Sequence, residues 1–419
     1  MRRSIVKIAL TGFLVTSGLV SPALSQELRM AIWSANEAHL ALFNEIADEF
    51  EASHPGVKIT YDSLAYEGYA TTLTTQIAGG NPPDLAWLFD TTAPDFMAAG
   101  ALYPLTETFA NTEGYDMGDF PPATLTAWSY EGVQYLYPFS TSPFGVFVNN
   151  DMIRAARAKT PAEMIAAGEW NWDNAIATAA KVAATGKQGL IIRDFEYKAW
   201  ENLAEVYTGW NAYPWSKDTK SCAFASPEMV DAMRFIHDAI FVKKAMPGPG
   251  VSADFFAGDV AMTTTQISRA ALLPKGDKAF DWDLVPLPKG PAGDYAVTGR
   301  AGIGVMASGK NPKLAAEFLA FFSSKPNVAK LARFFPPARQ SLLTADVLAA
   351  ANPLLSRKQI EAVVIRGVAT GQSTQQVLNF ARLQQTVRAG LDGLWRPDAD
   401  VAAVLQALCG RLDPLLAAN

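Results

Sequence analysis

The feature that most constrains the fold is an alternation between strand-like and helix-like segments after residue 26. Residues 27–34 and 57–64 have the pattern of strands, and residues 37–56 between them carry apolar side chains at helical spacing. Further strands are predicted at 83–89, 144–150, 189–193 and 302–308, and further helices at 69–80, 172–185, 226–241 and 311–324. This order predicts an α/β fold with a parallel sheet covered by helices on both faces. From about residue 327 the pattern is largely helical.

The length of the chain predicts two lobes. It has 419 residues, and a single hydrophobic core stops growing at roughly 250 to 300 residues. Hydrophobic residues make up 49% and charged residues 18% of the sequence, which is typical of a compact globular protein rather than a disordered one.

Residues 1–25 have the pattern of a cleaved secretory signal. Three basic residues precede an apolar stretch at 8–20, and small residues precede Gln26. A retained membrane anchor fits less well, because the stretch is short, Pro22 closes it and no cysteine follows to accept a lipid. No later segment offers the ~20 apolar residues of a membrane span. We therefore expect a soluble, exported protein.

Composition argues against several classes of partner and cofactor. Without the signal segment, the 35 basic residues fall to 32 against 41 acidic residues, a net charge of −9. Nucleic acid and anionic membranes are poor partners for such a chain, because both require a basic patch. The three histidines, His39, His54 and His237, are dispersed and have no partner at metal-ligand spacing. No cofactor or metal is expected.

Cys222 and Cys409 are the only cysteines. They are too few for a cysteine-based metal site, but an exported protein reaches a compartment where a disulfide persists. We expect the pair to be bonded. Two separate buried thiols are the alternative, because the sequence does not show the distance between them.

Residues 255–274 raise a question about a strand that ends in polar side chains. Val260, Ala261 and Met262 have the character of a buried strand, yet residues 263–266 are three threonines and a glutamine. An ordinary transition from strand to loop would explain the polar run. The other explanation is that the strand ends at a site where hydroxyl groups meet a ligand.

Six stretches resemble, in the same order, the extracellular solute-binding proteins of ABC importers, the family of sugar-binding proteins that contains maltose-binding protein. They are residues 77–85, 98–105, 132–151, 255–264, 282–290 and 302–322, among them "GVQYLYPFSTSPFGVFVNND" and "FFAGDVAMTT". Each stretch alone is a weak signal. The resemblance extends to about residue 340, and beyond it only the closing helices correspond.

The resemblance implies the two-lobed periplasmic-binding-protein fold, type II-like, in which each lobe is a sheet flanked by helices and hinge strands cross between the lobes. We assign residues 26–139 and 266–322 to the first lobe, and residues 140–265 and 323–419 to the second. Residues 260–264 are then expected to form one crossing strand, with residues 263–266 at the cleft, and residues 137–146 an earlier crossing. The implied function is capture of a sugar by a monomer that closes around it and delivers it to the membrane permease.

Candidate ligand-binding residues follow the predicted strands, because ligands of open α/β sheets bind beyond the carboxyl ends of strands. Asp90 and Thr91 correspond to positions where relatives grip sugar hydroxyls, although Asp90 could instead cap a helix. In the second lobe Tyr197 and Trp200 are three residues apart and would share one face of a helix, unless they pack in the core. The full set is Trp33, Ser34, Asn36, Glu37, Tyr66, Asp90, Thr91, Ser142, Arg193, Glu196, Tyr197, Trp200, Trp210, Gln266, Arg269 and Arg300.

Departures from the maltose-binding member leave the ligand open. Leu88 stands where that protein has tryptophan, Thr92 where it has arginine, and Ser142 where it has glutamate. Maltose is therefore not implied. Arginines at 193, 269 and 300 would also suit an anionic or phosphorylated molecule.

Two rival interpretations follow from other residue patterns. An exported carbohydrate-active enzyme would need a carboxylate pair such as Asp194 and Glu196, or Glu67 and Asp90. A receptor for iron or a polyamine on the same fold would fit the tyrosines of "YEGY" at 66–69. Catalytic turnover would support the first rival, and affinity for ferric ion would support the iron version of the second.

Overall fold

A computed structural model describes residues 26–66, 68–193, 195–373 and 375–418. The predicted signal segment, 1–25, lies outside the described residues. Within them, no helix is long and apolar enough to cross a membrane.

Eight strands form one sheet in the order β2-β1-β3-β10-β6-β8-β7, with β9 paired to β6. The strands are β1 (Gln26–Ile32), β2 (Val57–Ser63), β3 (Leu85–Phe89), β6 (Leu136–Asn149), β7 (Gln188–Ile192), β8 (Val260–Gln266), β9 (Trp282–Val285) and β10 (Thr298–Val305). A separate hairpin contains β4 (Ser129–Tyr130) and β5 (Val133–Gln134). The pairs β1–β2, β1–β3 and β7–β8 are parallel, as the alternation of strands and helices predicts, whereas β6 and β10 pair antiparallel to their neighbours.

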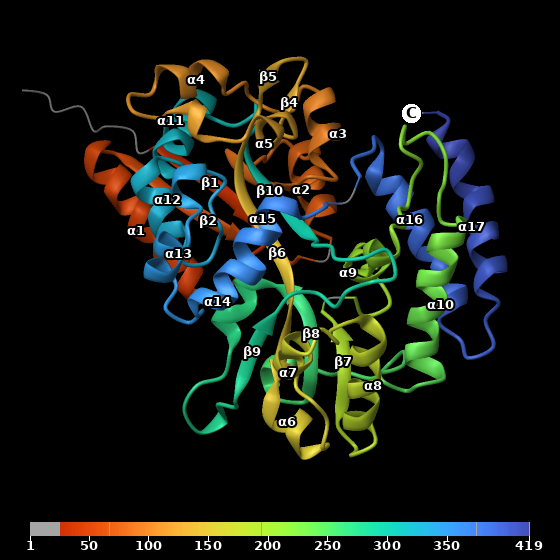
Figure 1. The fold of residues 1–419 in the computed structure, drawn as a ribbon. Coiled ribbons are helices and arrows are strands. Elements are labelled where there is room, and N and C mark those ends of the chain that lie inside the picture. The colour runs from red at the N-terminus through yellow and green to blue at the C-terminus, as the bar shows by residue number, and fades with distance from the viewer. Residues whose placement is uncertain (1–25, 67, 194, 374, 419) are drawn as a thin grey trace, which may run out of the picture.

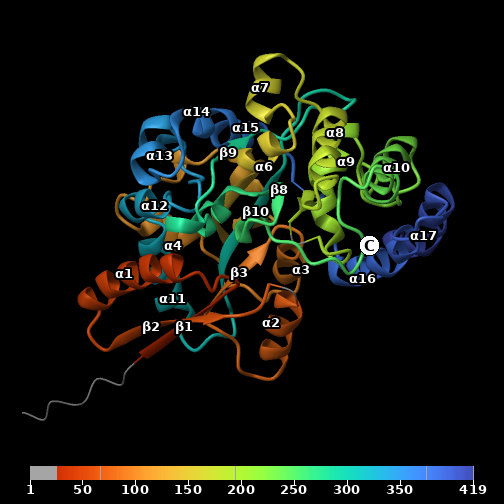
Figure 2. The same cartoon turned by 90° about the horizontal axis from the view of Figure 1, so that it is seen from below.

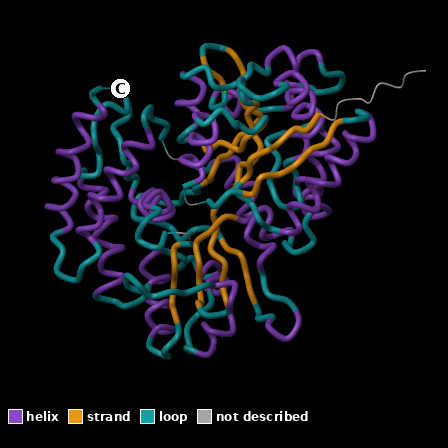
Figure 3. Tube along the Cα trace, turned by 180° about the vertical axis from the view of Figure 1, so that it is seen from behind, coloured by secondary structure: helices purple, strands orange, loops and turns teal. Residues whose placement is uncertain are grey.

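The long strand β6 belongs to both lobes. Its first part, up to Pro143, pairs with β10, which in turn pairs with β3. From Phe144 onward it pairs with β8 and β9. Figure 1 shows β6 running from the upper lobe into the lower one beside β10, and Figure 3 shows the remaining strands in two groups, one in each lobe.

Helices of the first lobe enclose the strands β1, β2 and β3 (Figure 2). They are α1 (Glu37–Ser53), α2 (Tyr69–Ala78), α3 (Ala93–Ala98), α4 (Thr106–Asn111), α5 (Pro122–Thr126), α11 (Pro312–Phe322) and α12 (Lys325–Leu331). Local signals define the helix starts: Asn36 caps α1, and Asn311 caps α11 before Pro312. Phe43, Trp87 and side chains of α11 fill the core between these elements.

Helices of the second lobe surround β7, β8 and the later part of β6. They are α6 (Asn150–Ala155), α7 (Pro161–Ala166), α8 (Trp172–Ala183), α9 (Ala204–Tyr207), α10 (Pro227–Phe241), α16 (Phe380–Leu391) and α17 (Val401–Leu416). Thr160 and Glu163 form a reciprocal capping box at α7, and Ser226 caps α10 before Pro227. The helices α10, α16 and α17 lie side by side at the right of Figure 1.

A third buried cluster covers β6 and β9 near the junction of the lobes. It includes side chains of α13 (Ala345–Ala351) and of the π-helix Ile360–Ile365, with Val363 packed in the same cluster as Phe147. The short helices α14 (Arg357–Gln359) and α15 (Arg366–Thr370) flank the π-helix in the chain. Single 3₁₀ turns complete the fold at Met117–Asp119, Trp200–Leu203, Thr208–Trp210, Phe255–Ala257, Ile267–Leu272, Gly276–Lys278, Gln340–Leu342 and Asp392–Leu394.

The packing differs from the expected lobe assignments in three places. β8 pairs with β6 and β7 in the second lobe, so residues 260–264 do not cross between lobes, whereas β6 pairs with β10 in the first lobe and with β8 in the second. β9 lies within the expected first lobe but pairs with the part of β6 beyond Pro143. Conversely, α12 packs in the core of the first lobe although it was assigned to the second. Pairing partners distant in sequence decide these assignments.

Cys222 and Cys409 form a disulfide bond, with their Cα atoms 5.2 Å apart. The bond joins the loop that precedes α10 to the final helix, α17. It closes a span of 187 residues, so it stabilises the second lobe chiefly by restricting the unfolded chain.

Helix α8 packs very closely against β7 at Gly189. A Cβ atom on Gly189 would lie 2.3 Å from the Ala179 carbonyl oxygen and 2.5 Å from that of Ala245. We expect Gly189→Ala to lower the free energy of unfolding by about 1 to 3 kcal/mol, measured by urea denaturation, because the backbone must shift.

Gly410→Ala is the matched control. Gly410 lies in α17 with open space around the position of a Cβ atom, so this substitution should raise stability by about 0.5 to 1 kcal/mol. Equal effects of the two substitutions would contradict the close approach.

Candidate functional site

The candidate site lies where β3, β10 and β6 meet. In the register of β10 and β6, Arg300 lies opposite Thr141 and Gly299 lies opposite Ser142. On the other side of β10, the backbone NH of Asp90 donates to the Arg300 carbonyl oxygen at 3.3 Å. The end of β3 and the crossing of β6 therefore place Asp90 and Ser142 on either side of one strand.

Asp90 is a buried carboxyl group with an unused oxygen. Its residue is 7% exposed, and burial raises its pKa to about 7, while nearby Arg300 and hydrogen bonds from Thr91 and Ser373 act in the opposite direction. Its Oδ2 atom has no hydrogen-bond partner among the described residues. Thr92, and not Asp90, stands at the start of α3, so the alternative that Asp90 caps a helix is wrong. A donor on a bound molecule would relieve the cost of this buried oxygen.

Two buried hydroxyl groups near the crossing share this property. Ser142 Oγ and Thr264 Oγ1 are buried without a hydrogen-bond partner in the described part of the chain. Thr264 lies opposite Val146 in the register of β8 and β6. Because side chains alternate along a strand, Ser142 and Val146 point to the same face, and Thr264 shares it.

The expectation that residues 263–266 surface together is wrong for the threonines. Thr263, Thr264 and Thr265 are fully buried because β8 is a central strand of the second lobe. The hydroxyl of Thr263 donates to the Thr264 carbonyl oxygen, and that of Thr265 to Gln266 Oε1. Only Gln266, at the end of β8, is partly exposed.

Three aromatic side chains form a partly exposed cluster next to Asp90. Trp33 follows β1, and its ring stacks on Phe89 at the end of β3, with the centroids 4.1 Å apart. Tyr66 meets both rings edge-on, at 6.3 Å from Trp33 and 5.4 Å from Phe89. Tyr66 is 42% exposed, so this cluster offers an apolar surface to solvent.

Other polar candidates of the first lobe have structural tasks. Asn36 caps α1 by accepting from the NH groups of Ala38 and His39, and Ser34 Oγ lies 2.9 Å from His39 Nδ1. Glu37 is exposed in the first turn of the same helix. Asn36 and Ser34 therefore stabilise the start of α1, and Thr91 is buried beside Asp90.

The arginines of the second lobe lie at strand ends and turns. Arg193 follows β7, approaches Asp254 at 3.9 Å and lies over the ring of Phe256. Arg269 lies in the turn after β8, and its charge, together with the larger effect of burial, lowers the pKa of His39 to about 4. Arg269 thus faces the first lobe. Glu196 is exposed at a positive φ of 40°.

The three aromatic candidates of the second lobe serve its core. Trp200 is 1% exposed and packs against Trp215 and Phe224, so the prediction that it faces a ligand is wrong. Tyr197 lies in a turn, outside any helix, between Phe195 and Trp395, and its hydroxyl donates to the carbonyl of Pro247.

Trp210 packs against Phe235, with the ring centroids 4.8 Å apart. In all three cases the sequence could not distinguish an aromatic of the core from one of a binding surface.

A polar segment that the sequence analysis missed crosses the same region. Gln372, Ser373, Gln375 and Gln376, which we call the polar strap, precede α16. Gln376 Nε2 donates to the Asp90 carbonyl oxygen at 3.0 Å, and Ser373 bonds to the Asp90 carboxyl group. A small hollow lies beside the strap and is lined in part by Tyr207, Thr208, Tyr213, Gln372, Ser373 and Gln375. The sequence did contain one sign of this strap, namely the group of glutamines at 372, 375 and 376 within a segment that was expected to be helical.

Two further sequence hypotheses concern metals and catalytic carboxylates. Among the described residues there is no cluster of three or more histidines, cysteines or carboxylates that could hold a metal ion. Glu67 and Asp194, each a member of a hypothetical catalytic pair, lie outside the described residues.

Comparison with known sequences identifies a family. Residues 34–329 match the family described as bacterial extracellular solute-binding protein. A putative binding protein of Brucella abortus is 25% identical over 341 residues, which covers 77% of this chain and 78% of the relative.

Solved structures with the same fold cover nearly the whole chain. An ABC substrate-binding protein of Listeria monocytogenes, in complex with cycloalternan, has a TM-score of 0.78 at 21% identity and covers 94% of this chain and 99% of its own. The maltose-bound MalE3 of T. maritima has a TM-score of 0.78 at 17% identity, covering 93% and 99%. The predicted two-lobed α/β fold is thereby confirmed.

The buried carboxyl group of Asp90 predicts a specific pH dependence of stability. Its pKa is about 7 in the folded protein and about 4 in an unfolded chain. Between these values the folded state holds a proton that the unfolded state releases, so stability falls as pH rises from about 4 to 7, with a slope of at most about 1.4 kcal/mol per pH unit.

Asp90→Asn removes this pH-dependent contribution to stability. The free energy of unfolding of the wild type and of the variant is measured by urea denaturation at several pH values. The stability of the wild type, relative to the variant, should decline up to about pH 7 and then level off. Parallel curves for the two proteins would contradict the raised pKa.

Proposed function

This chain belongs to the bacterial extracellular solute-binding proteins, and on that premise we propose that it captures a sugar or oligosaccharide, or a sugar derivative, between its two lobes. The ligand would bridge the lobes and favour a closed state, which the permease of an ABC importer recognises. We further propose that the protein acts as a monomer in the periplasm and needs no cofactor.

The strongest support for this proposal comes from buried side-chain oxygens that have no hydrogen-bond partner, near the point where β6 passes from one lobe to the other. Asp90 Oδ2 and Ser142 Oγ are buried acceptors without partners in the described chain. Leaving such atoms unpaired is costly, and a polyhydroxylated molecule supplies many donors in a small volume. A carboxylate also forms stronger hydrogen bonds than a neutral acceptor does.

The aromatic cluster complements these polar groups. Binding sites for small molecules combine apolar and aromatic walls with a few polar groups that fix the orientation of the ligand. Trp33, Tyr66 and Phe89 offer such a wall at the ends of β1 and β3, on the lobe that also carries Asp90. The C–H face of a sugar ring could pack on these rings while its hydroxyl groups reach the carboxyl group.

The crossing strands provide a route for closure. β6 changes partners between Pro143 and Phe144, and β10 has an irregularity between Ala301 and Gly302. Small backbone rotations at such points can move one lobe relative to the other without breaking either core. Closure would then bring Arg193, Gln266 and Arg269 toward the aromatic cluster.

A thermal-shift screen of the protein without residues 1–25 tests the ligand class. Sugars, polyols, sugar phosphates and ferric ion are screened, because a ligand that binds only the folded state raises Tm. Stabilisation by neutral sugars supports the proposal, whereas stabilisation by sugar phosphates alone would favour the anionic alternative. Turnover of a glycoside would instead favour the enzyme.

Closure of the two lobes is tested separately from ligand binding. For a sugar whose binding is established by calorimetry, small-angle scattering should show a smaller radius of gyration in the complex than in the free protein. An unchanged radius would contradict capture by hinge closure.

Above pH 7, where the Asp90 carboxyl group is ionised, Asp90→Ala should weaken binding of that sugar by about ten- to a hundredfold, because a hydrogen bond to a charged group is lost from a buried site. Calorimetry provides the measurement. Asp231→Asn is the control, because Asp231 lies exposed on α10 beside Arg234. Affinities equal to that of the wild type in both variants would exclude Asp90 from the site.

A further inference from the structure

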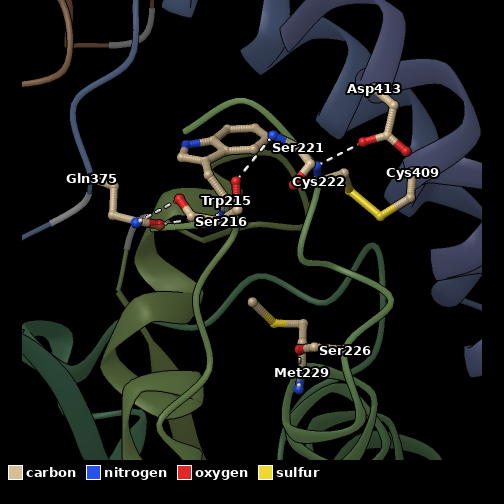
Figure 4. The surroundings of a disulfide bond; sticks show 9 residues. All are labelled: Trp215, Ser216, Ser221, Cys222, Ser226, Met229, Gln375, Cys409 and Asp413. Carbon is tan, nitrogen blue, oxygen red and sulfur yellow. Dashed lines mark hydrogen bonds between the residues drawn. A yellow bond between two sulfur atoms is a disulfide. The ribbon is translucent and has the colours of Figure 1, made fainter. Parts of the chain in front are cut away.

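The disulfide fixes a loop of the second lobe. Figure 4 shows Cys222 joined to Cys409 while the Cys222 NH donates to Asp413 Oδ1, at 2.7 Å, on the same helix α17. The loop is closed on itself, because Trp215 pairs with Cys222 in a bridge and the Ser216 NH donates to the Ser221 carbonyl oxygen. We call residues 215–222 the disulfide loop. Its position is therefore tied to α17.

Gln375 of the polar strap binds this loop through both ends of its amide. Its Oε1 atom accepts from the Trp215 NH at 3.3 Å, and its Nε2 atom donates to the Ser216 carbonyl oxygen at 3.3 Å. Figure 4 shows the Gln375 amide directed at this backbone. A neighbouring contact supports the same attachment, since the Tyr213 hydroxyl donates to Gln372 Oε1 at 3.1 Å.

The other side of the polar strap contacts the first lobe. Gln376 Nε2 donates to the Asp90 carbonyl oxygen and, at 3.4 Å, to that of Ala127. Ser373 acts on the same residue, because its hydroxyl lowers the pKa of the Asp90 carboxyl group against the larger effect of burial. Beyond the strap, the Asn379 NH donates to Asp95 Oδ1 at 2.8 Å. Adjacent residues thus hold the disulfide loop on one side and Asp90 on the other.

We propose that Gln375 is a positioning residue, which transmits the constraint of the Cys222–Cys409 disulfide to the polar strap and so keeps Ser373 and Gln376 on Asp90. Its effect on ligand affinity rests on the proposed function, but its effect on the strap does not. Gln375 is suited to this role because one amide group pairs with both a backbone donor and a backbone acceptor, and so fixes direction as well as distance.

The test is hydrogen exchange of the ligand-free protein, followed by mass spectrometry. Two variants are compared with the wild type: Gln375→Leu, which removes the amide, and Cys222→Ser/Cys409→Ser, which removes the disulfide. We expect both to accelerate exchange of the amides at Gln372 and Asn379 about fivefold, as the loss of hydrogen bonding on this scale implies. The combined variant should show little further increase, because both changes act through one contact.

Gln359→Leu is the control. The side-chain amide of Gln359 also forms a structural hydrogen bond, in which Nε2 donates to Asp283 Oδ1 at 2.8 Å. Gln359 lies in α14, away from the strap. Its variant should leave exchange at Gln372 and Asn379 unchanged. If removing the disulfide accelerates exchange only in the disulfide loop and α17, the bond is merely structural and the proposal is overturned. Additive effects of the two variants would also overturn it.

Calorimetry with maltose, or with another sugar that stabilises the wild type in the screen, adds a second readout. Gln375→Leu should raise the dissociation constant about five- to tenfold while Gln359→Leu leaves it unchanged. An unchanged constant for Gln375→Leu would overturn the effect on affinity. If no sugar binds the wild type, the proposed function fails, and hydrogen exchange still decides whether Gln375 positions the strap.

Discussion

The continuous pairing of β6 on both sides of Pro143 is the constraint on which the rest of the structure depends. One strand supplies an edge for β10 in the first lobe and for β8 and β9 in the second. A strand cannot leave either sheet without exposing a row of unpaired backbone groups. The lobes are therefore joined by hydrogen-bonded strands rather than by a loose linker.

Buried polar groups lie both at this junction and inside the two lobes. The cores are filled by aliphatic and aromatic side chains, and Arg339, buried in the first lobe, donates hydrogen bonds to the backbone carbonyls of Tyr115, Asp116 and Ser323. Asp90, Ser142 and Thr264 retain acceptors without partners in the described chain, and Trp87 Nε1, Trp200 Nε1 and Arg339 Nε are likewise buried donors without partners there. Fold stability alone gives no reason to keep such atoms, because apolar groups of similar shape would cost less there. Under the proposed function, a ligand that supplies donors to Asp90 and Ser142 would offset this cost at the junction.

Local patterns predicted the elements, and distant contacts determined their roles. The strands at 27–34 and 83–89 and the caps at Asn311 and Ser226 were predictable because periodicity and capping act within a few residues. The path of β8 was not, because a threonine run looks the same at a cleft and in a central strand. For the same reason, the sequence did not show that Trp200 packs in the core of the second lobe. The polar strap depends on partners 159 and 286 residues away, at Ser216 and Asp90, which no local pattern encodes.

Because β10 lies between β3 and β6, the first lobe is not contiguous in sequence. Its sheet has a vacant position until Thr298–Val305 arrives, after the residues of β7, β8 and β9 have already been made. During synthesis and export, neither lobe can therefore finish before the other has begun. The order of translation therefore differs from the order of assembly, and the sheet of the first lobe is completed only after the residues of β10 have been synthesised.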